Sequence, residues 1–341
     1  MDDMTMSDEE RRLFSQWTEV DGDIGPEPTA IERMAVSSRV GTARLDNTRR
    51  PYWSVPEGID CINDIPYVDD GSRPHLLDLY LPHESVVRAG RTTPVYIDIH
   101  GGGFVYGYKE LNRNFCTHLA KEGFAVFSLN YGLAPRKDFM DQLRDVNLAL
   151  AWIRDHMGEY PVDPGKVFLT GDSAGGTLGL YTLAVECSQD FAQAIGIVPS
   201  GLHFTGGAFI SGLFDLTGYV DLTEGDFDRT GSPVDTLAFM SPWFFRSFGA
   251  TGARRYVDLD RMAGQVDFPP LFLNTSSDDF IQDNSLALAL ALSRQGKVFE
   301  LHDVRPAKGV SLGHVYPVCM SWLEESQETL ERIRRFSYDL I

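Results

Sequence analysis

Basic residues are scarce in this chain of 341 residues, which has 30 Lys and Arg against 49 Asp and Glu and a formal charge of −19. Proteins that bind nucleic acid need a basic face to meet the phosphates, so this charge argues against a nucleic-acid partner. Long apolar runs are also missing, because no stretch approaches the roughly 18 residues of a membrane span. The start, Met1-Asp2-Asp3-Met4, lacks the positive region and apolar core of a signal peptide. We therefore expect a cytoplasmic protein with no membrane span.

Cysteines are few and widely spaced, and none of them forms a C-x-x-C pair. They are Cys61, Cys116, Cys187 and Cys319. Zinc and redox motifs are therefore absent, and without a secretory signal we expect free, mostly buried thiols. The acidic stretch 221–228 lacks the spacing of a calcium loop and is interpreted as a solvated segment. The sequence thus predicts neither a metal nor a cofactor.

Strand-like and helix-like segments alternate along the middle of the chain. The composition, 43% hydrophobic and 23% charged, is that of a globular protein. The length fits either one large α/β domain with an insertion or two ordinary domains. The alternation predicts an α/β fold with a mostly parallel central sheet and helices on both faces. The expected strands are Leu76–Leu81, Val95–Ile99, Phe124–Leu129, Val167–Thr170, Ala208–Ser211, Leu271–Asn274 and Lys297–Leu301.

Three helices are indicated by apolar spacing or by helix-forming residues. Between Leu143 and Met157 the apolar residues recur at intervals of three and four, which predicts an amphipathic helix on the sheet. The Leu/Ala run 286–292 has a period of two but strong helix formers, and we predict a buried helix capped by Asn284 or Ser285. A last helix is expected from about Ser321 to Phe336, with Trp322, Leu330 and Ile333 facing inward.

Two regions, 1–55 and 213–266, do not fit the alternation. The first has an acidic start and a helical stretch around 9–17, and the second becomes strongly aromatic. Together they are predicted to form a helical cap over the carboxyl end of the sheet, where ligands bind in such folds. The alternative is that each is a peripheral packing element. The predicted division is a cap segment 1–55, a core in two parts, 56–212 and 267–341, and a cap insertion 213–266.

The pentapeptide Gly171-Asp172-Ser173-Ala174-Gly175 fits the turn that presents a nucleophilic serine between a strand and a helix. The serine of such a turn has a strained backbone, so the residues two before and two after it must be nearly without side chains. Both are glycine here, an apolar run precedes the motif, and a segment suited to a buried helix follows it. Ser173 is therefore the candidate nucleophile.

A second glycine-rich motif, His100-Gly101-Gly102-Gly103-Phe104, follows the expected strand Val95–Ile99. Glycines let the backbone come close enough for its N–H groups to face a carbonyl oxygen. Gly102 and Gly103, together with the N–H of Ala174, are the candidate oxyanion hole. We expect His100 to hold the loop by hydrogen bonding.

These paired motifs resemble those of the hormone-sensitive lipase family of esterases, of the bacterial type IV kind, within the α/β-hydrolase superfamily. Tyr131-Gly132-Leu133-Ala134-Pro135, with Phe139 and Asp145 downstream, is similar to another segment of that family. The resemblance covers roughly residues 75 to 340 and is weakest in the two atypical regions. It implies an α/β-hydrolase fold, a Ser-His-Asp triad and a cap.

The resemblance also indicates the acid and the base. The family's D-P-L-x-D pattern maps onto residues 279–283, which implies Asp279 as the orienting acid, with Asp278 as the reserve and with Phe280 in place of proline. In this fold the histidine follows the acid, and only His302 and His314 do so. His314 lies in a segment similar to the family's G-x-x-H-G-F, although Val315 replaces its glycine. We expect a structural role for His302 at the end of a strand.

The resulting hypothesis is a serine carboxylesterase that hydrolyses short- to medium-chain carboxylic esters through an acyl-enzyme on Ser173. An amide or carbamate hydrolase or a deacetylase with the same triad remains an alternative, as does a non-catalytic binding protein on this scaffold. The resemblance also makes a homodimer an expectation. Residues that we predict to line an apolar substrate pocket are Phe104, Tyr106, Trp243, Phe244 and Phe245.

Overall fold

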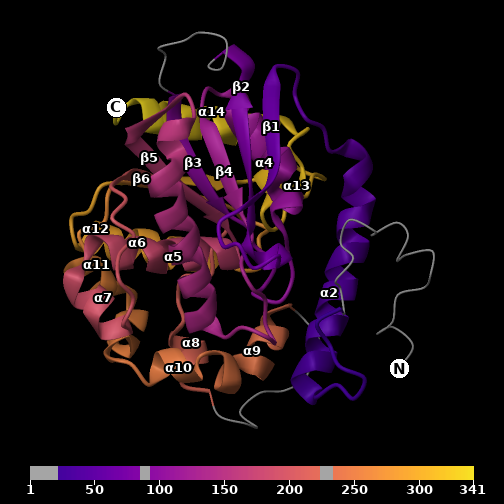
Figure 1. The fold of residues 1–341 in the computed structure, drawn as a ribbon, viewed down its shortest axis with the longest axis vertical. Coiled ribbons are helices and arrows are strands. Elements are labelled where there is room, and N and C mark those ends of the chain that lie inside the picture. The colour runs from indigo at the N-terminus through magenta and orange to yellow at the C-terminus, as the bar shows by residue number, and fades with distance from the viewer. Residues whose placement is uncertain (1–21, 85–92, 223–232) are drawn as a thin grey trace.

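The core of the molecule is one eight-stranded sheet, seen in a computed structural model that describes residues 22–84, 93–222 and 233–341 (Figure 1). The strand order is β1-β2-β4-β3-β5-β6-β7-β8. β2 runs antiparallel to both β1 and β4, and all other neighbours are parallel. The strands are β1 Ile59–Pro66, β2 Leu76–Pro82, β3 Thr93–Ile99, β4 Ala125–Leu129, β5 Val162–Asp172, β6 Phe204–Ile210, β7 Leu271–Ser276 and β8 Phe299–Val304.

All seven strands expected from the sequence are present, and the mostly parallel α/β fold is confirmed. Among the strands of the described residues, only β1, at the edge of the sheet, was not predicted from the sequence. Most of its residues are exposed or half-buried, so it has no apolar run to mark it.

Helices connect the strands and cover the sheet. They are α2 Ala30–Arg49, α4 Lys109–Lys121, α5 Phe139–His156, α6 Ala174–Cys187, α7 Gln189–Ile195, α8 Thr217–Val220, α9 Pro233–Phe244, α10 Arg246–Gly249, α11 Leu259–Gln265, α12 Gln282–Arg294, α13 Tyr316–Cys319 and α14 Glu324–Tyr338. Short 3₁₀ helices also occur, for example Arg50–Tyr52 directly after α2. No helix among the described residues is long and apolar enough to cross a membrane.

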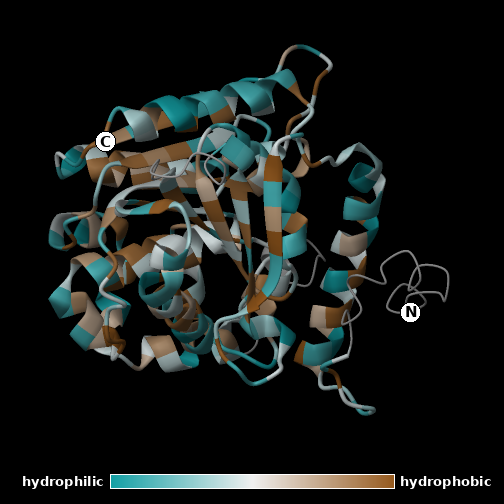
Figure 2. Ribbon diagram, turned by 45° about the horizontal axis from the view of Figure 1, so that its top comes forward, coloured by the Kyte–Doolittle hydropathy of each residue, from teal (hydrophilic) through white to brown (hydrophobic). Residues whose placement is uncertain are grey.

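Each face of the sheet has its own apolar core. Alternate residues of β3 point to opposite faces, so Ile97 packs with α5 and α6, whereas Tyr96 packs with α4 and α14. Figure 2 shows the brown, hydrophobic strands enclosed between helices whose teal faces turn outward. The predicted helix around Leu143–Met157 is α5, with Val146 and Ile153 fully buried.

Two helix predictions need correction. The Leu/Ala run lies in α12, but Leu286 and Leu290 are exposed, because the helix places only one of its faces against the sheet. Neither predicted residue caps it: α12 follows Ile281 without a side-chain cap, and the Asn284 side chain instead accepts hydrogen bonds from the backbone N–H groups of Phe214 and Asp215. In the last helix Leu330 and Ile333 are buried as expected.

Trp322 does not face inward as predicted. It precedes the first residue of α14, is 39% exposed and packs its ring against Tyr52, with 5.0 Å between the ring centroids. The predicted helix around residues 9–17 and most of the acidic stretch lie outside the described residues. The four cysteines are free, although Cys61 is exposed rather than buried.

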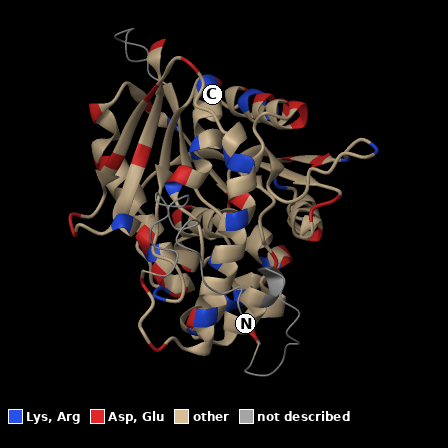
Figure 3. Cartoon of the chain, turned by 90° about the vertical axis from the view of Figure 1, so that its right-hand side faces the viewer, with Lys and Arg blue, Asp and Glu red and all other residues tan. Residues whose placement is uncertain are grey.

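The atypical regions lie at one end of the sheet. α2 runs along the side of the molecule and contacts α9, while α8 and α10 lie below the sheet in Figure 1 and α11 lies to the left beside α12. Lys, Arg, Asp and Glu are distributed over the outer surface of these helices and of the core (Figure 3). The sheet therefore has one end that is covered by segments from both atypical regions.

Candidate active site

Ser173 stands in the sharp turn between β5 and α6. Its backbone angles, φ 50° and ψ −119°, are strained for a residue with a side chain. A Cβ on Gly171 would lie 2.7 Å from the carbonyl carbon of Gly175, and one on Gly175 would collide with the carbonyl oxygens of Ile99 and His100. The two glycines are therefore required by contact with the backbone.

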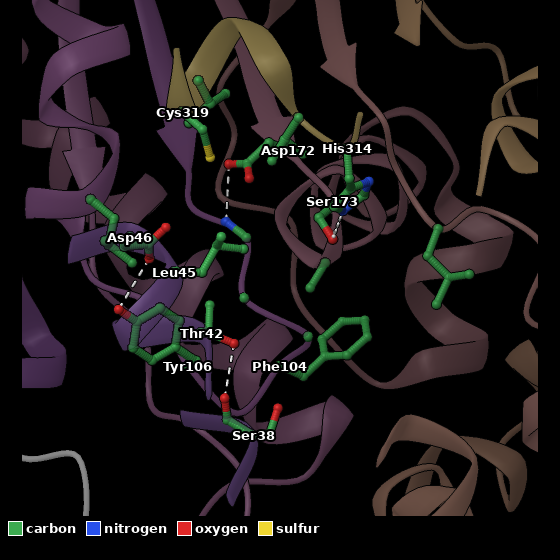
Figure 4. A pocket seen from close by; sticks show the side chains of 18 of the residues that line it. Ser38, Thr42, Leu45, Asp46, Phe104, Tyr106, Asp172, Ser173, His314 and Cys319 are labelled. Carbon is green, nitrogen blue, oxygen red and sulfur yellow. Dashed lines mark hydrogen bonds between the residues drawn. The ribbon is translucent and has the colours of Figure 1, made fainter. Parts of the chain in front are cut away.

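Three side chains from distant parts of the chain form a hydrogen-bonded row. The Ser173 hydroxyl donates to His314 Nε2 at 2.9 Å, and His314 Nδ1 donates to Asp279 Oδ1, also at 2.9 Å. Figure 4 shows Ser173 and His314 pointing toward one another at the cavity. Asp279 follows β7 and His314 precedes α13, so the carboxyl ends of parallel strands bring them together.

Asp279 is held in its charged form. Burial raises the pKa of this carboxyl, but hydrogen bonds from His314, Ser211 and the N–H of Ile281 outweigh it and keep the pKa below its usual range. Its neighbour Asp278 turns away from the row. It accepts hydrogen bonds from the Leu312 and Gly313 N–H groups at 3.0 Å and so anchors the loop that carries His314.

The other two histidines singled out from the sequence make structural contacts. His100 is fully buried and donates through Nδ1 to the Gly101 carbonyl at 2.7 Å, while burial lowers its pKa to about 4. The ring therefore stays neutral and stacks on Tyr131. His302 Nδ1 lies 3.4 Å from polar atoms of Asn274 and Thr329.

The glycine loop brings backbone N–H groups to the serine. Gly101 N donates to Asp172 Oδ1 at 3.0 Å, which ties the loop to the residue before Ser173. The N–H groups of Gly102, Gly103 and Ala174 donate to no other described residue. All three residues line the same cavity as Ser173, so these donors are available to a ligand.

Two departures from the family pattern lie beside His314. Val315 has φ 50°, a left-handed conformation that is costly for a β-branched residue and explains why glycine is the usual residue there. Phe280 is 55% exposed, and its ring centroid lies 4.6 Å from that of His314. Both residues line the cavity.

The cavity beside Ser173 has a volume of about 250 Å³. Phe104 and Tyr106 contribute to its wall, as predicted, but Trp243, Phe244 and Phe245 do not. Phe244 and Phe245 are buried in the core behind Phe104, because the aromatic cluster packs on itself and on Phe139. The wall is completed by residues of both atypical regions, namely Ser38, Thr42, Leu45, Asp46, Arg49, Trp53, Leu213, Tyr219, Thr236 and Leu237.

Sequence reasoning missed two buried carboxyl groups of the cavity wall. Asp46 of α2 is 7% exposed, and burial raises its pKa to about 6. Asp172 is also buried with a raised pKa, and Asn112 Nδ2 donates to it at 2.8 Å. Asp172 lies within the serine motif and so carried a signal, but nothing in the sequence around Asp46 marks it.

Nothing in the described part of the chain suggests a bound metal. No group of three or more His, Cys, Asp or Glu side chains lies close enough there to hold one.

Comparison with known proteins identifies the family of this chain. The sequence pattern of the family described as alpha/beta hydrolase fold matches residues 96–308, and the chain belongs to that family. Esterase LipQ of Mycobacterium tuberculosis is 30% identical over 163 residues, which cover 48% of this chain and 38% of LipQ. The match thus spans well under half the length of this curated relative.

Solved structures extend the likeness to nearly the whole chain. Esterase B from Lactobacillus rhamnosis is 28% identical with a TM-score of 0.78, covering 91% of this chain and 95% of its own. An esterase of the bacterial hormone-sensitive lipase family shares the fold at 21% identity and a TM-score of 0.63, with 99% of both chains covered. The family match and these neighbours confirm the resemblance that the sequence motifs indicate.

Proposed function

We propose that this protein is a serine carboxylesterase of short- to medium-chain esters. The observation that carries the proposal is the hydrogen-bonded row from Asp279 through His314 to Ser173. The N–H groups of the glycine loop line the same cavity and donate to no other described residue. Relatives support it, since LipQ is an esterase and esterase B is known in complex with a C4-C4 tributyrin phosphonate inhibitor. A cavity of about 250 Å³ suits an acyl chain of modest length.

The mechanism follows from the roles of the three side chains. His314 Nε2 takes the proton of Ser173 as Oγ attacks the ester carbonyl, and the ionised Asp279 stabilises the imidazolium. The N–H groups of Gly102, Gly103 and Ala174 stabilise the oxyanion. His314 then protonates the departing alcohol, and water, deprotonated by the same imidazole, hydrolyses the acyl-enzyme.

Ser173→Ala tests this proposal directly. In purified, folded protein we expect p-nitrophenyl ester hydrolysis to fall by at least about 10⁴-fold, because the nucleophile is lost. A fluorophosphonate should label the wild type and not the variant. Hydrolysis that persists in the folded variant would place the reaction elsewhere, and a wild type that stays unlabelled would favour a non-catalytic binding protein.

Matched ester and anilide substrates separate the carboxylesterase from an amide hydrolase or deacetylase with the same triad. We expect kcat/KM for the ester to exceed that for the anilide with the same acyl group. A p-nitrophenyl series from acetate to palmitate then measures chain length, and a maximum at palmitate would contradict the preference for short chains.

A further inference from the structure

The cavity wall carries a group of polar and ionisable side chains where α2 and the segment after His314 meet. This polar end consists of Asp46, Arg49, Asn112, Asp172 and Cys319. In Figure 4 Asp46 and Tyr106 lie on the opposite side of the cavity from Ser173 and His314. A carboxylate in a substrate cavity is costly unless a partner compensates its lost hydration, so its presence needs an explanation.

Among the described residues, only one oxygen of the Asp46 carboxylate has a direct hydrogen-bond donor. Tyr106, itself fully buried, donates its hydroxyl to Asp46 Oδ2 at 3.1 Å. Oδ1 has the Arg49 guanidinium at 3.9 Å, which is too far for a direct hydrogen bond. Burial outweighs both neighbours and raises the pKa of this carboxyl. One acceptor on the cavity wall is therefore left for a ligand.

The gap between Asp46 Oδ1 and Arg49 Nη1 has the size that a single hydroxyl group bridges. A hydroxyl donates one hydrogen bond and accepts others, so it can donate to the carboxylate while it accepts from the guanidinium. An ammonium group fits less well, because it accepts nothing and would lie against the positive Arg49. The remaining wall, with Leu45 and Leu213 among its members, suits the alkyl chain between the two ends.

We propose that the polar end of the cavity selects esters whose chain ends in a hydroxyl group, with Asp46 and Arg49 as its two partners. This inference rests on the proposed function, because it assigns the substrate class of the same cavity. Asp46 and Arg49 are specificity residues in it, since neither belongs to the hydrogen-bonded row of Ser173.

Matched pairs of esters test the inference, with hydrolysis followed by pH-stat titration. On the acyl side the pair is methyl 6-hydroxyhexanoate and methyl hexanoate, and on the alcohol side it is 6-hydroxyhexyl acetate and hexyl acetate. In one of the two pairs we expect the wild type to favour the hydroxyl ester by about tenfold in kcat/KM, as a hydrogen bond to a charged group allows. Methyl 6-aminohexanoate, protonated at neutral pH, should gain no such advantage.

Substitutions at Asp46 should change the ratio of kcat/KM between the hydroxyl ester and its matched ester. Asp46→Leu should reverse the preference, because it leaves the substrate hydroxyl without its acceptor, and Asp46→Asn, which keeps the size of the side chain, should weaken it. Thr48→Ala is the matched control, since Thr48 lies exposed on the same helix and does not line the cavity. Far-UV circular dichroism and a thermal melt establish that each variant is folded.

The outcomes separate this inference from the proposed function. If the wild type hydrolyses both members of each pair equally well, or if Asp46→Leu leaves the ratio unchanged, the hydroxyl class is wrong while the esterase stands. A preference for the ammonium ester that Asp46→Asn abolishes would also overturn it. If no ester is hydrolysed faster by the wild type than by Ser173→Ala, the proposed function itself fails.

Discussion

The two ends of the cavity hold buried carboxylates that behave in opposite ways. Asp279 sits behind His314 and is kept charged by several donors, whereas Asp46 on α2 has a raised pKa and only one direct donor among the residues that the structure describes. The first end is completed by the protein alone, as a reaction site must be before a substrate arrives. The second is incomplete, which is typical of a surface that a ligand completes.

The ends also differ in how the chain builds them. Ser173, Asp279 and His314 all stand at the carboxyl ends of the sheet or in loops directly after it, and glycines set the backbone there. The wall near Asp46 comes from a helix far away in sequence, packed on the core by its own buried face. The candidate reacting groups are thus held by the sheet and its loops, whereas the wall near Asp46 is built by α2.

Replacing the two neighbouring aspartates one at a time is expected to show the largest effect, a loss of kcat at the first end of the cavity. Asp279→Asn should lower kcat by about 10⁴-fold, because the uncharged amide neither orients His314 correctly nor stabilises its charged form. Asp278→Asn should cost far less, about tenfold, since it weakens only the bonds that anchor the loop. Steady-state kinetics on p-nitrophenyl butyrate measures both variants. Equal losses would mean that Asp278 shares the role assigned to Asp279.

The next largest effect is expected at the glycine loop, where alanine substitutions of Gly102 and Gly103 should lower kcat to different extents. A Cβ on Gly102 would collide with the Tyr106 carbonyl oxygen, whereas one on Gly103 meets no atom within 4 Å. We expect Gly102→Ala to displace the donors and lower kcat by about 10²- to 10³-fold, with KM changing less. Gly103→Ala should keep most activity despite its φ of 60°, which costs alanine on the order of 1 kcal/mol. The reverse order of the two variants would contradict this view of the loop.

The contrast between the ends explains what the sequence could predict. The serine turn and the glycine loop can be predicted because a side chain would clash at fixed positions of each motif, so that glycine is required there. The fold can be predicted from the buried apolar runs of its strands. β1 cannot, because it is an edge strand without such a run. The prediction of Asp279 and His314 depended on the family resemblance, because a single aspartate or histidine has no recognisable local sequence pattern.

Tertiary packing decided the rest. Phe244 and Phe245 were predicted to line the pocket because aromatic residues suit an apolar wall, yet they bury more surface in the core behind Phe104. Asp46 had no signal, because its environment is made by Tyr106, Arg49 and neighbouring loops. Such positions depend on which distant segments meet, and no local pattern records that.

Phe280 offers a smaller test at the boundary between the ends. Its ring packs against His314 and lines the cavity, so Phe280→Ala should loosen the imidazole and lower kcat/KM by about tenfold or less. Phe280→Leu, which keeps an apolar side chain of similar reach, should recover part of the loss. The measurement is kcat and KM on the butyrate ester at neutral pH. Unchanged kinetics in Phe280→Ala would limit Phe280 to an exposed surface position.

The smallest effect expected is the pH dependence that Asp46 adds to stability. Its pKa is about 6 in the folded protein against an ordinary 3.8, so the folded state binds this proton more tightly and stability falls as the pH rises from about 4 through 6. The groups that face it are Arg49, Tyr106, Asp172 and Cys319. Between pH 5 and 7.5 the wild type should lose about 1 kcal/mol relative to Asp46→Asn. Urea unfolding of both proteins at the two pH values measures this difference, because other titrating groups are common to both. If the difference in the free energy of unfolding between the two proteins stays constant, or grows in favour of the wild type at pH 7.5, the charge of Asp46 is as well compensated as that of Asp279. The two ends of the cavity would then no longer differ in this respect.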